Sequence, residues 1–278
     1  AIRSGVRSYN LKHAITDPLE HHAVLHSMDC INKELGTQID YLNVDDNGNI
    51  DINQLEDLLK NNSQTLVSIM HANNEIGNKN PIEEIAQLCK KYDALFHCDT
   101  VQTLGHFSHD VRALGIDFMV GSAHKLHGPK GVGFIYVNGE RKINPLLHGG
   151  SQERGMRGGT ENVSGIIGMA KALEIAYQEM DSHKSHIDKI KTRMIEKLKS
   201  SITDVHFNGN SADLDNSLYT VLSVCLPPSE VSEMLLFNLD IAGISASGGS
   251  ACTSGANAGS HVLEGINSDP NRPTVRFS

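Results

Sequence analysis

The sequence lacks the cysteine pairs that mark a disulfide framework or a zinc knuckle. It has five cysteines, an odd number, and none of them forms a CxxC pair: Cys30, Cys89, Cys98, Cys225 and Cys252. Disulfide-rich secreted domains and structural zinc sites are therefore disfavoured. Reduced thiols in an intracellular protein are the expected state.

Long apolar runs are also missing. No stretch approaches the ~20 apolar residues that a membrane span needs. The first residues, AIRSGVRSYNLKHAITDP, have no apolar central stretch of the kind found in signal peptides. We therefore expect a cytoplasmic protein without membrane contact.

The sequence also has fewer basic than acidic residues, and it has no motif with the spacing of metal ligands. The formal net charge is -9, which argues against a general nucleic-acid binder. The fifteen histidines are scattered, without an HExxH or a His/Cys cluster at ligand spacing. We predict no metal, no direct nucleic-acid binding and a polar small-molecule substrate.

The sequence does contain an alternation of short apolar strands and amphipathic helices, which is typical of an α/β fold. Its 278 residues, 39% of them hydrophobic, are enough for a large core in one or two domains. A helix is expected from Pro81 through IEEIAQLCKKY, with proline at the first turn. Strands are expected at residues 65–70, 94–99, 116–122 and 131–137.

Two domains are expected, with a boundary near residue 180. A glycine-rich stretch, HGGSQERGMRGGTEN, precedes a long helical run that could leave one domain for the other. Residues 1–180 would form the large domain. Residues 181–278, with VHFNG and YTVLSVCLP, would form a smaller α/β domain.

Polar residues follow the predicted strands, where ligands bind in open α/β sheets. Lys125, in SAHK, is a candidate Schiff-base lysine, and Ser122 and His124 beside it could hold an anionic phosphate. Asp99, in HCDTVQ, could pair with a protonated pyridine nitrogen, and Gln102 could reach the same ring. Taken singly, SAHK is more often a surface turn, and an isolated Asp99 is more often a helix cap.

Three further segments could carry chemistry. His21, in LEHHAVL, could stack on a cofactor ring and move protons, although surface histidines at a helix start are the commoner case. Cys252 lies among glycine, serine and alanine in SASGGSACTSGANAG, which suits either a thiol nucleophile or a packing turn. Arg276, in TVRFS, could clamp a substrate carboxylate or form a surface ion pair.

Together these motifs resemble the group I cysteine desulfurases, of the nitrogen-fixation and iron–sulfur-cluster type, in the class V aminotransferase family. The resemblance covers almost the whole chain and keeps the family's order of motifs, namely LEHHAVL, SIMHANNEIG, HCDTVQTLG, GSAHKLHGPKGVG, LHGGSQERGMRGGTEN, SGGSACTSG and TVRFS. It implies a fold-type-I enzyme dependent on pyridoxal 5'-phosphate, with a mostly parallel central sheet, that works as a homodimer.

The resemblance also implies a role for each matched residue. Lys125 would carry the cofactor, His21 would stack on its ring and transfer protons, and Cys252 would attack the substrate sulfur. The remaining roles are cofactor contacts by Asp99, Gln102, Ser122, His124 and Asn74, a contact of Thr160 with the neighbouring subunit's phosphate, and a hold on the substrate carboxylate by Asn74 and Arg276.

The implied reaction converts L-cysteine to L-alanine and leaves a persulfide on Cys252. The sulfur would then pass to an acceptor protein, for iron–sulfur clusters, thio-cofactors or nucleic-acid sulfuration. A selenocysteine lyase on the same scaffold is an alternative. The family's N-terminal phosphate loop and its C-terminal end are not found, which leaves open an inactive scaffold or binding homologue.

Overall fold

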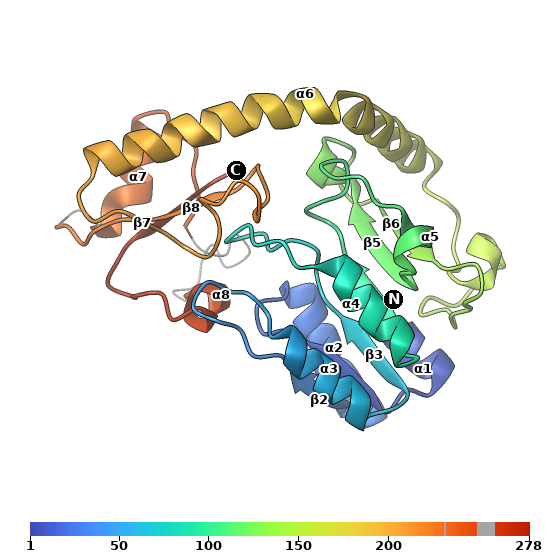
Figure 1. Cartoon of the computed structure of the whole chain (residues 1–278). Helices are drawn as coiled ribbons and strands as arrows, with labels where there is room; N and C mark the ends of the chain where they lie inside the picture. The colour runs from blue at the N-terminus through green and yellow to red at the C-terminus, as the bar shows by residue number, and fades with distance from the viewer. Residues whose placement is uncertain (231, 249–258) are drawn as a thin grey trace. The chain divides into compact units, whose positions relative to one another are not determined.

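The computed structural model describes residues 1–230, 232–248 and 259–278 (Figure 1). The chain divides into two compact units. Unit 1 comprises Ala1–Asn43, Asp51–His71 and Asn80–Met180, and unit 2 comprises Val44–Ile50, Ala72–Lys79 and Asp181–Ser278. Cys252 lies outside the described residues.

Unit 1 is built around a six-stranded sheet. Its strand order is β2-β1-β3-β4-β5-β6, with parallel pairing up to β5 and an antiparallel β6 at the edge. The predicted α/β fold with a mostly parallel central sheet is confirmed. The elements of this unit are α1 (Ile2–Tyr9), β1 (His13–Thr16), α2 (His22–Leu35), β2 (Gln38–Tyr41), α3 (Ile52–Asn61), β3 (Thr65–Ser68), α4 (Ile82–Lys91), β4 (Leu95–Asp99), α5 (Val111–Leu114), β5 (Phe118–Ser122), η1 (Ala123–Leu126), β6 (Gly133–Val137) and η2 (Gln152–Gly155).

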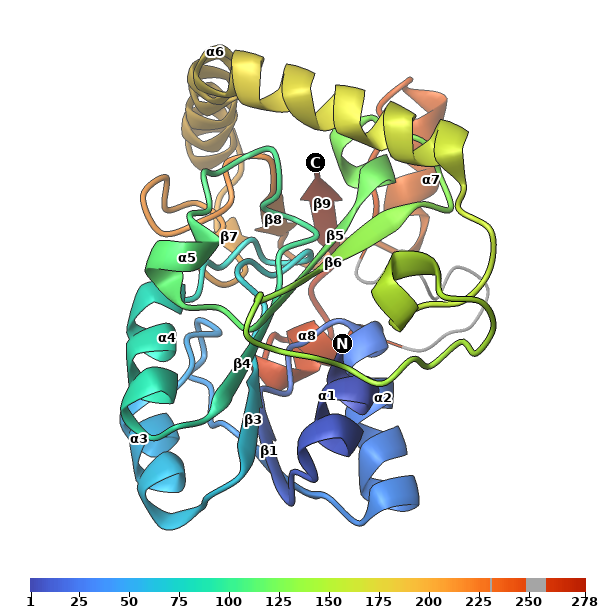
Figure 2. The ribbon, with the colours of Figure 1, turned by 90° about the vertical axis from the view of Figure 1, so that its right-hand side faces the viewer.

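Helices cover both faces of this sheet, as Figure 2 shows, with α1 and α2 on one face and α3 and α4 on the other. Between the sheet and the first pair lies an apolar cluster that includes Val6, Met28, Ile31, Leu66 and Phe118, all buried. This burial on both faces explains why β3, β4 and β5 read as mostly apolar runs in the sequence.

The ends of the helices follow from local side-chain chemistry. The helix predicted from Pro81 is α4, with Pro81 as its cap, glutamates in the first turn and lysines in the last. Helix α2 begins after His21, whose Nδ1 accepts the Ala23 N–H at 3.1 Å, and ends at Gly36 in the left-handed region.

Strands β1 and β2 have no counterpart in the sequence prediction. β1 is only four residues long and contains two polar residues, yet all four are buried. His13 is satisfied there by Thr65 at 3.1 Å and Asp40 at 2.8 Å. Tertiary hydrogen bonds, which a local pattern does not reveal, allow this polar segment to enter the sheet.

Unit 2 contains a three-stranded antiparallel sheet of order β7-β8-β9. The long helix α6 runs through residues of both units. The elements are α6 (Val163–Ser201), β7 (His206–Phe207), β8 (Leu222–Cys225), η3 (Ser232–Met234), α7 (Leu235–Ile241), α8 (His261–Gly265) and β9 (Thr274–Phe277).

Candidate active site

The predicted cofactor residues of unit 1 gather at the carboxyl ends of its parallel strands. Asp99 is the last residue of β4, and Ser122 is the last residue of the neighbouring β5. The register pairs Asp99 with Val120, so both strand ends lie at the same edge of the sheet. His21 follows β1 at that edge, after a short loop.

A single turn presents Lys125 beside the two candidate phosphate ligands. Ser122 Oγ and His124 Nδ1 lie 2.8 Å apart, and Lys125 is the next residue, in η1. Ala123 and Leu126 of the same turn are buried against Met169 at the start of α6. His124 and Lys125 are exposed. The turn is therefore held by its buried apolar residues, and its polar side chains are accessible to solvent.

The loop after β4, which carries Asp99 and Gln102, is held on both sides. Thr100 Oγ donates to the carbonyl of Val120 on β5 at 2.8 Å. On the β3 side, Thr103 Oγ lies 3.0 Å from His71 Nδ1. Gly121 permits the close packing, because a Cβ there would lie 2.6 Å from Leu104 Cδ2. Gln102 itself is half-buried.

The electrostatic surroundings of Asp99 are those of a buried carboxyl that a cationic partner would stabilise. Burial raises the pKa of its carboxyl, while the Val101 N–H and the nearby His21 act in the opposite direction. Its Oδ1 accepts that N–H at 2.9 Å. A protonated ring nitrogen would relieve the cost of burying this charge, so the side chain fits a pyridine cofactor.

His21 carries its proton on a defined atom. Because Nδ1 accepts the Ala23 N–H, the neutral ring is protonated at Nε2. The ring is half-buried and close enough to Asp99 to affect the pKa of that carboxyl. It can therefore offer a donor to a group bound at this edge.

Unit 2 brings together Asn74 and Arg276, which are 202 positions apart in the sequence. The Nη1 of Arg276 donates to the backbone carbonyl of Asn74 at 3.1 Å, so the contact uses the main chain of Asn74. The Nε of Arg276 is buried without a hydrogen-bond partner among the described residues. An unsatisfied guanidinium N–H fits an anionic ligand such as a carboxylate.

Two predicted residues remain, of which the structure describes Thr160. Thr160 is exposed and lies within the glycine-rich segment that precedes α6. Cys252 lies outside the described residues. Among the described cysteines, Cys89, Cys98 and Cys225 are buried and Cys30 is half-buried, and all four are free thiols.

Two acids at this edge escaped the sequence analysis. Asp17 and Glu20 follow β1 and are buried to 2% and 0% exposure. Burial raises the pKa of Asp17 to about 6. Burial also raises the pKa of Glu20 well above its usual value, and the carboxylates of Asp17 and Asp99 raise it further. The available signal was the glutamate that directly precedes His21 in LEHH.

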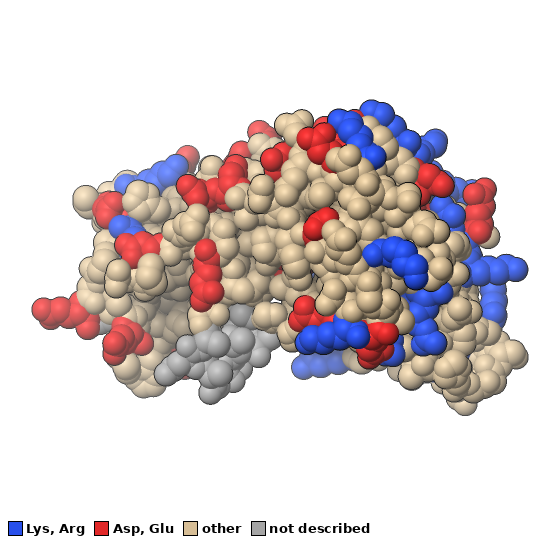
Figure 3. Space-filling view, turned by 90° about the horizontal axis from the view of Figure 1, so that it is seen from below, with Lys and Arg blue, Asp and Glu red and all other residues tan. Residues whose placement is uncertain are grey.

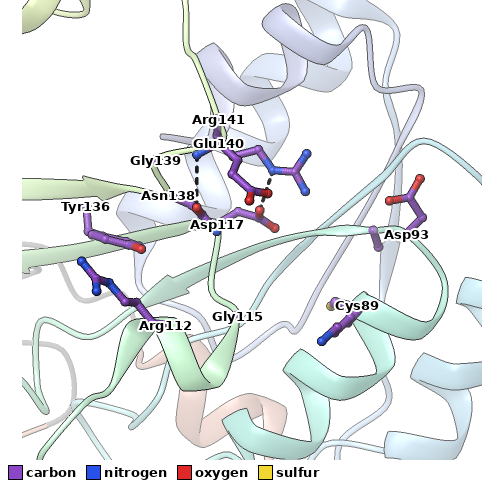
Figure 4. A pocket seen from close by; sticks show the side chains of 12 residues that line it. Cys89, Asp93, Arg112, Gly115, Asp117, Tyr136, Asn138, Gly139, Glu140 and Arg141 are labelled. Atoms are coloured by element: carbon purple, nitrogen blue, oxygen red, sulfur yellow. Dashed lines mark hydrogen bonds and ion pairs between the residues drawn. The ribbon is translucent and has the colours of Figure 1, made fainter.

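A hollow of about 700 Å³ lies at the opposite edge of the sheet, before β4 and β5 and after β6 (Figure 4). Asp117 there accepts from Arg141 Nε at 2.7 Å and from the Phe96 N–H at 2.8 Å. Its carboxylate thus ties β4 to the segment after β6, and none of the motif residues lines this hollow.

Other classes of site find no support in the part of the chain that the structure describes. No group of three or more metal-ligating side chains occurs among the described residues. Within the same ranges, no helix has the length and apolarity to cross a bilayer. On the face in Figure 3, lysine and arginine lie mostly on the right-hand side of the view, with some aspartate and glutamate between them.

Comparisons with known proteins agree with the resemblance read from the motifs. The family described as "Aminotransferase class-V" matches residues 6–278. Cysteine desulfurase IscS of Dictyoglomus turgidum is 45% identical over 256 residues, covering 92% of this chain and 64% of that protein. Putative cysteine desulfurase IscS 1 of Bacillus subtilis is 42% identical over 270 residues, covering 96% of this chain and 70% of that protein.

Solved structures give the same picture. A NifS-like protein has a TM-score of 0.87 and 35% identity, covering 100% of this chain and 72% of that one. A NifS-like protein from Rickettsia africae has a TM-score of 0.84 at 28% identity. The chain thus spans about two thirds of the length of these relatives, and the predicted family resemblance is confirmed.

Proposed function

Because the chain belongs to the class-V aminotransferase family, and within it is related to the IscS and NifS-like cysteine desulfurases, we propose that it is a pyridoxal-phosphate-dependent cysteine desulfurase. One arrangement carries the proposal. Lys125 follows the Ser122–His124 pair at the end of β5, and Asp99 ends the adjacent β4. A covalent lysine, a phosphate hold and a counter-ion for a pyridine nitrogen are what this cofactor requires.

Each residue would have one task. Lys125 would bind the cofactor covalently through Nζ, Ser122 and His124 would hold its phosphate, and Asp99 would keep a proton on the pyridine nitrogen. Gln102 would contact the ring hydroxyl. The bound group supplies an electron sink for the carbon that loses its proton.

His21 would lie over the ring and transfer a proton with Nε2. Asn74 and Arg276 would hold the substrate carboxylate, to which the Nε of Arg276, unpartnered among the described residues, could donate. The thiolate of Cys252 would then attack the substrate sulfur: an S–S bond forms, the carbon–sulfur bond breaks, and its electron pair stays with the carbon. Protonation of that carbon gives alanine, and the enzyme keeps a persulfide.

The test of this proposal is the reaction itself. The yellow, cofactor-loaded chain should convert L-cysteine to L-alanine, with one persulfide formed per alanine in the first turnover. Arg276→Lys keeps the charge but loses the forked donor geometry, so it should raise the KM for cysteine about tenfold or more. A chain that takes up pyridoxal phosphate but forms no alanine would contradict the proposal.

We also propose that the chain acts as a homodimer through unit 1. Large apolar side chains are exposed before and after the glycine-rich segment in the sequence. They are Leu146, Leu147, Val163, Ile166 and Ile167. Exposed apolar groups of this size mark protein interfaces. A second copy is the occupant we favour, because exposed Thr160 lies in the same segment and would then reach the neighbour's phosphate.

Sedimentation analysis should therefore give a mass of twice 30.2 kDa. Ile167→Glu should shift the chain towards a monomer, since a charge would have to be buried in the interface. The matched control is Ile190→Glu, an exposed isoleucine further along α6, which should leave the mass unchanged. A monomeric parent chain would overturn this assignment.

The sulfur would pass from Cys252 to an acceptor protein, with an iron–sulfur scaffold or a sulfur carrier as the expected class. We place the protein in the cytoplasm, which suits the free thiols of the described residues.

A further inference from the structure

Glu20 makes a buried connection between two parts of the proposed cofactor site. Its side chain is fully buried, and its Oε1 accepts the backbone N–H of Met70, where the chain leaves β3. The next residue, His71, donates its N–H to the carbonyl of Asp99 at 2.9 Å. One carboxyl is therefore two hydrogen bonds away from the strand end that carries Asp99.

The same carboxyl also fixes the start of α2. Glu20 directly precedes His21, and the backbone N–H of His21 lies close enough to the Glu20 carboxyl to lower its pKa. Since His21 caps α2 through its own ring, a shift of Glu20 would move both the ring and the first turn of the helix. Glu20 thus sets the position of His21 relative to the exit of β3.

The surroundings of Glu20 disfavour a negative charge. After burial, two nearby carboxylates raise the pKa of Glu20 further, namely Asp17 from its own loop and Asp99 from β4. Cys98, also on β4, is a buried thiol whose pKa is raised by burial and by the nearby Asp99. Three close carboxyls in a buried place cannot all ionise at modest cost, so protons must be retained.

We propose that Glu20 is a positioning residue of the cofactor site, which ties His21 to the exit of β3 and acts as a neutral carboxylic acid. This inference rests on the proposed function, which places His21 and Asp99 at the cofactor ring. A neutral Glu20 leaves Asp99 as the carboxylate that faces the ring nitrogen. Glu20 itself touches neither cofactor nor substrate.

The proton on Glu20 has a consequence for the chain without cofactor. In the unfolded chain a glutamate ionises near pH 4.3, whereas folded Glu20 stays protonated to higher pH. The folded state then binds one more proton, so stability falls as pH rises above about 4.3, until Glu20 ionises in the folded state. Each pH unit in that window should cost up to about tenfold in the folding equilibrium constant.

Glu20→Gln removes this dependence while it keeps an acceptor oxygen for Met70. The measurement is urea unfolding of the full chain freed of cofactor. As pH rises, the folding equilibrium constant of Glu20→Gln should increase relative to that of the parent chain by up to about tenfold per pH unit. Glu84→Gln, at an exposed glutamate of α4, should follow the parent chain at every pH. If stability changed with pH in the same way in Glu20→Gln and in the parent chain, the proposal that folded Glu20 is protonated would be wrong.

The positioning role is tested on cofactor binding. Glu20→Ala leaves the Met70 N–H buried and unpaired, so pyridoxal phosphate should bind about tenfold or more weakly. Glu20→Gln should restore the affinity to within about threefold of the parent. Parent-like affinity in Glu20→Ala, or a loss in Glu20→Gln as large as in Glu20→Ala, would overturn the role. Because the unfolding test uses no cofactor and no cysteine, its outcome is independent of whether the chain desulfurates cysteine.

Discussion

Lys125→Ala should abolish the yellow colour of the loaded chain and lower alanine formation from L-cysteine by about 10²–10⁴-fold. Lys125 would bind the cofactor covalently and, once displaced by the substrate, would be free to transfer a proton. The variant loses both functions. Borohydride treatment of the parent chain should fix the cofactor to the peptide that contains Lys125, as read by mass spectrometry.

The structure makes this variant easy to interpret. The Lys125 side chain is exposed, whereas its turn is held by the buried residues Ala123 and Leu126, which the substitution leaves in place. Stability should change by no more than about 0.5 kcal/mol. Lys130→Ala, at an exposed lysine five positions on, is the matched control and should retain colour and rate. Cofactor fixed to a different lysine would refute the assignment.

The position of the site at the sheet edge could be predicted from short patterns. The apolar strands before HCDTVQ and before SAHK are continuous enough to recognise, and polar residues at their carboxyl ends mark the ligand edge. The register of β4 against β5, which pairs Asp99 with Val120, then brings the two motifs together. Here local sequence and tertiary structure agree.

Other parts of the site depend on contacts that no local pattern contains. Strand β1 was not predicted because it contains polar residues. It can nevertheless be buried, because its histidine is hydrogen-bonded to residues of β2 and β3. Glu20 reads as an ordinary helix-start residue until the fold buries it beside Asp17. The contact of Arg276 with Asn74 joins positions 202 residues apart and uses a backbone carbonyl, which carries no sequence signal.

Cys252→Ser should abolish the persulfide and the transfer of sulfur to any acceptor, and should lower alanine formation strongly as well. A hydroxyl cannot take up the sulfur, so the carbon–sulfur bond of the substrate has no acceptor for its departing atom. The measurements are persulfide by mass spectrometry and alanine by amino-acid analysis, both in a single turnover.

The described cysteines are poorly suited to replace this thiol. Burial raises the pKa of Cys89 and of Cys98, which keeps both protonated and out of reach. Cys30 is more accessible, but its hydrogen bond to Glu34 at 3.3 Å raises the pKa of its thiol. Cys30→Ser is therefore the matched control, and it should form persulfide at the rate of the parent chain.

The chain connects position 252 to the proposed carboxylate ligand. Ser247 and Arg276 exchange backbone hydrogen bonds in both directions, at 3.1 and 2.6 Å. Cys252 follows Ser247 by five positions in the sequence. Persulfide that persists in Cys252→Ser and vanishes in Cys30→Ser would reverse the assignment.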